Sequence, residues 1–133
     1  MNLILPFKTI VFIVFLTIFS FTLFAQPVRY VKPVATGLAN GSSWANASAD
    51  LQAMINISPA GGEVWVAAGT YIPTYHPVTG AINPIDRNNT FVLLPNVNVY
   101  GGFAGTETLL SQRNYAANAT ILSADIGTVG LTT

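Results

Sequence analysis

The stretch Gly61-Gly-Glu-Val-Trp-Val-Ala-Ala-Gly-Thr-Tyr71 decides how this chain is interpreted. Its β-branched and aromatic residues are typical of a short strand, and the glycines around them are typical of sharp bends. Pro73 follows and stops the strand, because proline lacks the N–H group that a sheet needs. The pattern predicts a strand over residues 63–67, with its two valines on one face and Trp65 on the other.

Two later stretches echo this pattern, one over residues 96–105 and a weaker one over residues 119–125. Their strands are expected at 97–100 and 120–123, and segment 90–94 is expected to be ordered and extended as well. Short glycine-bracketed strands that recur every roughly 20–30 residues are typical of a stacked solenoid. Between the quoted stretch and its first echo, the proline-rich residues 72–89 are expected to form an irregular excursion.

A first strand and a short helix are expected before the quoted stretch. Residues 28–32 alternate apolar and polar side chains, which indicates a strand ended by Pro33. An amphipathic helix is indicated by the apolar spacing of Leu51, Met54 and Ile55. Ser48 is expected to cap it, and Asp50 to lie in its first turn. We expect this helix to close one end of the solenoid.

The first 25 residues have the layout of a secretory signal peptide. Lys8 precedes an apolar run that ends at Ala25, and the polar pair Gln26-Pro27 follows. The run is shorter than the roughly 20 residues that cross a bilayer as a helix. Cleavage is therefore expected after Ala25, and an uncleaved membrane anchor is the alternative. Export is expected in both cases.

The charge content excludes several classes of partner. Only 8% of residues are charged and the net charge is zero, so the sequence predicts no nucleic-acid surface and no polybasic membrane patch. Contact with a membrane is expected only through the signal segment. The chain has no cysteine, so no disulfide can support an exported fold. We also expect the chain to be the N-terminal part of a longer protein, with further coils to follow and an open strand edge at its end.

Several motifs together resemble the start of secreted right-handed parallel β-helix proteins of the pectate-lyase-like fold, found in Bacteroidetes-type bacteria. The motifs that carry the resemblance are Tyr30-Val-Lys-Pro, Gly41-Ser-Ser-Trp44, Leu51-Gln-Ala-Met-Ile55, Gly62–Tyr71, Val99-Tyr-Gly-Gly-Phe-Ala-Gly-Thr-Glu107 and Thr120–Gly127. The resemblance implies an all-β, pectin-lyase-like solenoid with a short N-terminal capping helix, incomplete at its C-terminus. It divides the chain into a signal peptide (1–25), a strand and capping helix (26–62) and the first coils (63–133). Members are often adhesin-like surface proteins.

The search for catalytic residues predicts none. His76 is the one histidine and there is no cysteine, so no zinc-binding spacing exists and no metal or cofactor is expected. The carboxylate candidates are Asp86, Glu107 and Asp125, which would stack if each lay on a successive coil. The competing interpretation pairs Asp86 with Arg87, exposes Glu107 on a turn and places Asp125 at a corner; it is favoured, because none of the three lies within a strand.

The aromatic side chains suggest one form of binding. The candidates for stacking on sugar rings are Trp65, Tyr71, Tyr75 and Tyr100, and packing within the fold is the alternative for each. The sequence therefore predicts an exported, structural or adhesive β-helix scaffold, with extracellular glycans or surface proteins as partners. The alternative is the N-terminal part of a polysaccharide lyase or glycoside hydrolase of the same fold.

Overall fold

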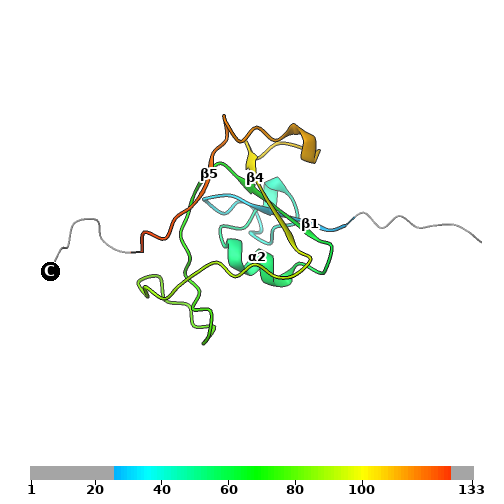
Figure 1. Ribbon diagram of the computed structural model, residues 1–133. Helices are drawn as coiled ribbons and strands as arrows, with labels where there is room; N and C mark the ends of the chain where they lie inside the picture. Colours follow the sequence, from blue (N-terminus) through cyan, green and yellow to red (C-terminus); the bar gives the residue numbers. More distant parts are fainter. Residues whose placement is uncertain (1–25, 127–133) are drawn as a thin grey trace, which may run out of the picture.

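The computed structural model describes residues 26–126, which form a small mixed fold of short strands around one α-helix (Figure 1). The predicted signal segment, residues 1–25, lies outside the described residues, as do residues 127–133. The elements in chain order are β1 (Val28–Val31), the 3₁₀ turn η1 (Trp44–Asn46), α2 (Leu51–Ile57), β2 (Glu63–Ala67), β3 (Gly69–Tyr71), β4 (Asn98–Phe103), the 3₁₀ turn η2 (Leu110–Gln112) and β5 (Thr120–Leu122). Within this part of the chain, no helix is long and apolar enough to cross a membrane.

The strands form two separate parallel sheets. Strands β1, β2 and β4 make a three-stranded sheet in that order, and β3 pairs with β5 in a two-stranded sheet. In the larger sheet Tyr30 lies beside Trp65, and Trp65 lies beside Tyr100. The register between β2 and β4 shifts after Trp65, so that Ala67 pairs with Phe103. The positions of all three predicted strands in this sheet are confirmed to within a few residues.

The prediction of an all-β, right-handed parallel β-helix is wrong for the described residues. They form a mixed fold with one α-helix and two parallel sheets of three and two strands, and no solenoid coil repeats along them. A solenoid needs equivalent elements in each repeat. Here residues 72–97 between β3 and β4 contain no strand, and β3 and β5 have only three residues each. The parallel pairing is therefore local to two small sheets.

One face of the larger sheet packs against α2. The core contains Val31, Leu51, Met54, Ile55, Val64, Val66 and Tyr71, so the predicted apolar stripe of the helix and the inward face of β2 are both confirmed. The predicted cap is corrected. Asp50 is the N-cap and accepts a hydrogen bond from the Ala53 N–H, 2.9 Å away, whereas the Ser48 hydroxyl accepts from the Asp50 N–H. The N-cap lies two residues later than predicted, and Ser48 instead forms an isolated bridge with Val31.

The opposite face of the larger sheet is covered by aromatic rings. Trp65 stacks on Phe103, with ring centroids 4.7 Å apart, and Trp44 lies 5.6 Å from the same Phe103 ring. Tyr30 meets both tryptophans edge-on. Because both faces are covered, β2 is buried from Val64 to Ala67, as is usual for strands of a parallel sheet.

Gly69 divides the stretch 61–71 into two strands that belong to different sheets. Its φ angle is 144°, and a Cβ atom there would collide with the Pro33 ring. Residues other than glycine rarely adopt this conformation. The chain therefore leaves the larger sheet at Ala68 and enters the smaller one at Gly69, a division that the sequence did not predict.

Residues 90–94 are extended but belong to no sheet. The backbone of Val92 is instead paired with the buried side chain of Gln52 on α2: the Val92 N–H donates to Oε1 at 2.8 Å, and Nε2 donates to the Val92 C=O at 3.0 Å. The same amide nitrogen donates to Oδ1 of Asn56. A strand-like segment thus finds its hydrogen-bond partner on a helix, which leaves space beside it.

Candidate functional site

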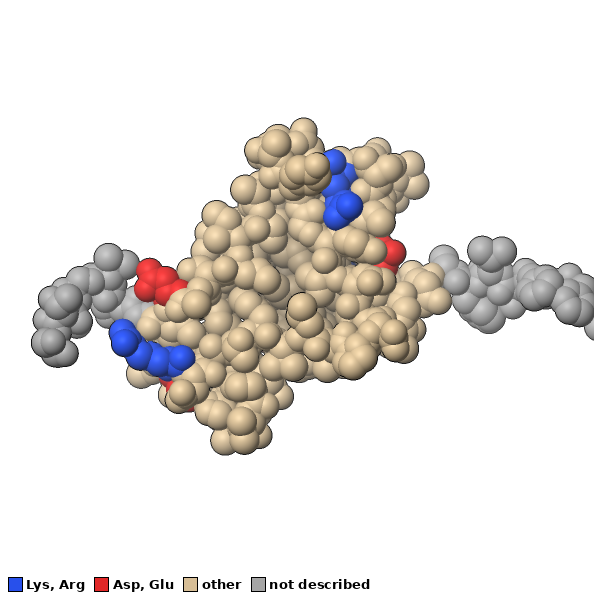
Figure 2. Space-filling view, viewed as in Figure 1, with Lys and Arg blue, Asp and Glu red and all other residues tan. Residues whose placement is uncertain are grey.

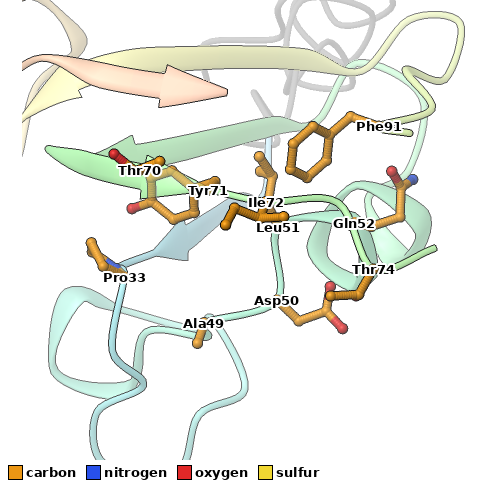
Figure 3. Close-up of a pocket in the computed structure, with 10 residues that line it drawn as sticks. All are labelled: Pro33, Ala49, Asp50, Leu51, Gln52, Thr70, Tyr71, Ile72, Thr74 and Phe91. Carbon is orange, nitrogen blue, oxygen red and sulfur yellow. The ribbon is translucent and has the colours of Figure 1, made fainter. Parts of the chain in front are cut away.

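A cavity lies where the start of α2, the end of β3 and Phe91 meet. It has a volume of about 400 Å³. Figure 3 shows the apolar side chains of Leu51 and Ile72 between Tyr71 on one side and Phe91 on the other. Asp50 and Thr74 lie at its rim. Cavities of this size accommodate small organic ligands or one to two sugar rings.

A second, smaller hollow of about 120 Å³ adjoins the first. The two share Asp50, Gln52 and Thr74, so they lie on either side of this polar trio. Tyr75 and Ile82, which form an isolated antiparallel bridge in the excursion, complete the smaller hollow. Together the two hollows form a groove along α2, which we call the α2 groove.

The polar groups of the α2 groove are held in place by the fold. Asp50 is exposed to solvent, and one of its carboxylate oxygens caps the helix by accepting a hydrogen bond from the Ala53 N–H. The Gln52 amide is engaged on both sides by Val92 and so is rigid. The Tyr71 hydroxyl donates to the Ala67 C=O at 3.0 Å, and burial raises the pKa of this phenol far above its usual value. Tyr71 therefore stays neutral and contributes an apolar wall.

The four aromatic residues predicted to stack on sugar rings have different surroundings in the structure. Trp65 and Tyr71 are each only 4% exposed, and neither presents a ring face to solvent, so packing is their role here. Tyr100 is half-buried beneath the Arg113 guanidinium, which lies 4.9 Å from its ring centroid. Tyr75 is half-buried and lines the smaller hollow of the α2 groove. Of the four, Tyr71 contributes to the wall of the larger hollow and Tyr75 to that of the smaller one, whereas Trp65 and Tyr100 line neither.

The three predicted carboxylates do not meet in one cavity. Asp86 accepts hydrogen bonds from the backbone and side chain of Asn88. Asp125 and Arg87 line a separate hollow near Ile126. Among residues 26–126 no three His, Cys, Asp or Glu side chains gather as metal ligands would.

Glu107 folds back over its own turn. Its carboxylate accepts from the N–H groups of Ala104, Gly105 and Thr106 at 2.6–2.9 Å. Partial desolvation acts to raise its pKa, but these backbone hydrogen bonds together lower the pKa below its ordinary value. Glu107 therefore organises a turn rather than a site.

Sequence reasoning missed most of the α2 groove. Phe91 lies in a segment that was expected to be extended, and Thr74 in an excursion that was expected to be irregular. Asp50 was expected in the first turn of the helix, but no binding role was predicted for it. No local signal links these three residues, since they come together only when the excursion returns to α2.

The face of the molecule shown in Figure 2 carries little charge. Lysine, arginine, aspartate and glutamate appear in small groups at its two ends, with uncharged surface between them. No known protein family, curated protein or solved structure shows significant similarity to the chain.

Proposed function

We propose that this protein is exported to the cell surface or secreted, and that it acts by adhesion, holding neutral saccharides in the α2 groove. Export is argued from the apolar run that ends at Ala25. Adhesion to glycans is argued from the groove, and the observation that carries it is the combination of a rigid apolar floor with a polar rim.

The lining suits the two sides of a sugar ring. Leu51, Ile72 and Phe91 present apolar surface against which the C–H face of a sugar would pack. Asp50 and Thr74 at the rim would accept and donate hydrogen bonds to sugar hydroxyl groups. Tyr75 extends this wall into the smaller hollow, so a second ring would continue along the groove.

The charge of the groove favours a neutral ligand. Asp50 is the charged residue in the lining of both hollows. An anionic sugar such as a uronate would be repelled by this carboxylate, which has no basic partner in the lining. Glycoside hydrolysis uses two carboxyl groups about 5–10 Å apart, and the groove supplies one. We therefore expect binding without turnover.

Binding is tested with the full chain, expressed in a bacterial host and purified in the form that the host exports, on an array of neutral and uronate-containing glycans. Asp50→Asn keeps the helix cap because asparagine caps as well as aspartate, and Thr74→Val keeps the shape but removes the hydroxyl. Each is expected to weaken binding of the selected neutral glycan roughly tenfold, as for one lost hydrogen bond to ligand. Thr106→Val, on an exposed turn remote from the groove, is the control.

Three outcomes would contradict this proposal. One is the absence of binding to any neutral glycan. Another is binding that both groove variants leave unchanged. Release of shortened sugars from a bound glycan would instead favour the alternative of a carbohydrate-active enzyme.

A further inference from the structure

The smaller hollow of the α2 groove has two walls of different origin. One wall is α2 with its N-cap, and the other comes from the segment 74–83, which contributes Thr74, Tyr75, Gly80 and Ile82. This segment folds back on itself, because Tyr75 and Ile82 form an antiparallel bridge and the Asn83 N–H donates to the Thr74 C=O at 3.1 Å. We call residues 74–83 the groove hairpin. In Figure 1 it lies at the bottom of the view, away from the two sheets.

His76 closes the turn of the groove hairpin. Its Nδ1 atom accepts hydrogen bonds from the N–H groups of Val78 and Thr79, each at 3.2 Å. Its backbone pairs across the turn as well, since the His76 N–H donates to the Ala81 C=O and its C=O accepts from the Gly80 N–H. Nδ1 accepts only when it carries no proton, so this geometry requires the neutral ring with its hydrogen on Nε2.

The turn is in direct contact with the wall of the hollow. Gly80 lies beside the Tyr75 ring, because a Cβ atom at Gly80 would be 3.8 Å from the Tyr75 hydroxyl oxygen. Both residues line the smaller hollow together with Gln52 and Asn56 of α2. A change in the turn therefore moves a ring and a backbone segment that a ligand would contact.

We propose that protonation of His76 opens the groove hairpin and so weakens binding in the α2 groove at acidic pH, a form of regulation that rests on the proposed glycan-binding function. A proton taken up from solvent occupies the lone pair of Nδ1, which then no longer accepts from Val78 and Thr79. The neutral ring therefore stabilises the closed hairpin, and this stabilisation is lost as the pH falls. Histidine is the side chain that ordinarily changes its charge between pH 5 and 8.

Other charged or titratable groups surround the groove hairpin. Asp50 at the start of α2 lines the smaller hollow together with Tyr75. Asp86 and Arg87 lie in the segment that follows the hairpin and returns to it, where a backbone N–H donates to the Tyr75 C=O. Within residues 26–126, the hydrogen bonds of the His76 ring come from two backbone N–H groups. Any effect of the surrounding groups would remain as a pH dependence in a variant without the imidazole.

Two substitutions separate the role of the acceptor from that of the proton. His76→Asn places an amide oxygen on Cγ, where Nδ1 stands, so it accepts the same two N–H groups but takes up no proton. His76→Ala removes the acceptor. The dissociation constant for the selected neutral glycan is measured with the full chain, purified in the form that the host exports, at about pH 5 and pH 8.

The unaltered chain is expected to bind roughly tenfold more weakly at the lower pH, as for one lost hydrogen bond. His76→Asn is expected to bind equally well at both pH values, whereas His76→Ala is expected to bind weakly at both. A pH dependence of binding that His76→Asn retains would overturn the proposal, because another group would then be responsible.

Nuclear magnetic resonance of the ligand-free chain tests the hairpin without any glycan. The nuclear Overhauser contact between the side chains of Tyr75 and Ile82 is expected at pH 8 and lost at pH 5, and His76→Asn is expected to keep it at both. A contact that persists at pH 5 in the unaltered chain would overturn the proposal even if glycans bind. If the hairpin opens but no neutral glycan binds at either pH, the proposed function fails, and the regulation of binding fails with it.

Discussion

At the scale of single residues, Glu107 illustrates how a carboxylate that looks like a catalytic candidate serves a turn. Its two carboxylate oxygens accept hydrogen bonds from three backbone N–H groups. In addition, the Trp44 indole N–H donates to the backbone C=O of Glu107 at 2.8 Å. The turn after β4 is thereby tied to the aromatic face of the sheet. Sequence reasoning placed Glu107 on an exposed turn, but it did not predict which groups the carboxylate would bind.

Glu107→Ala is expected to lower the free energy of unfolding at pH 7 by about 1 kcal/mol, because three N–H groups lose a charged acceptor in a partly exposed turn. The folded-state pKa of Glu107 is lowered. Its contribution is therefore fully present above the ordinary glutamate pKa, and it is lost as the pH falls through the lowered value. Urea unfolding at pH 7 and at about pH 3 measures this. A difference between the two proteins that grows on acidification would contradict the assignment.

At the scale of elements, the pairing of α2 with residues 90–94 decides where the α2 groove lies. Gln52 is buried, and its amide occupies both backbone groups of Val92. In a sheet these groups would pair with a neighbouring strand. Because a helix side chain satisfies them instead, the segment stays apart from both sheets and places Phe91 over the groove.

Gln52→Ala is expected to lower the free energy of unfolding by about 2–3 kcal/mol, because it leaves the polar groups of Val92 without partners in a partly buried position. It is also expected to loosen Phe91 and so to weaken any ligand of the α2 groove. Urea unfolding measures the first effect, and Asn56→Ala is the control because it removes only one of the hydrogen bonds of Gln52. Equal effects of the two substitutions would argue against the role of the Val92 pairing.

At the scale of the whole molecule, the two covered faces of the larger sheet hold the fold together. The aliphatic core with α2 lies on one face, and the rings of Tyr30, Trp44, Trp65 and Phe103 lie on the other. Phe103 is fully buried and contacts both tryptophans. A fold of this size has a small margin of stability, so one ring of this cluster is a large fraction of it.

Phe103→Ala is expected to lower the free energy of unfolding by about 3–5 kcal/mol, enough to unfold much of the population at 37 °C. The near-ultraviolet circular dichroism of the two tryptophans reports the loss of the cluster directly. Tyr115→Ala removes an equally large ring from a side chain that is mostly exposed, and is expected to change stability by less than about 0.5 kcal/mol. A stable, ordered Phe103→Ala protein would show that the aromatic face is dispensable.

Much of the local structure could be predicted from the sequence. The strands at 28–31 and 63–67, the apolar stripe of α2 and the irregular excursion all follow from periodicity, glycine and proline. These signals depend on neighbouring residues, so they are readable along the chain. Of the α2 groove only Tyr71 and Tyr75 were predicted as binding candidates, because its lining comes from segments distant in sequence.

The sequence by itself determined where the chain becomes extended or helical and which side chains are apolar. Only the tertiary structure decided that the stretch 61–71 is shared between two sheets and that residues 90–94 pair with Gln52. The physical reason is that several distant segments compete to hydrogen-bond with, and to bury, each extended segment. The local sequence pattern does not specify which of these partners forms the more stable contact. The repeated strands therefore predicted a solenoid, whereas the described chain forms two short parallel sheets around one helix.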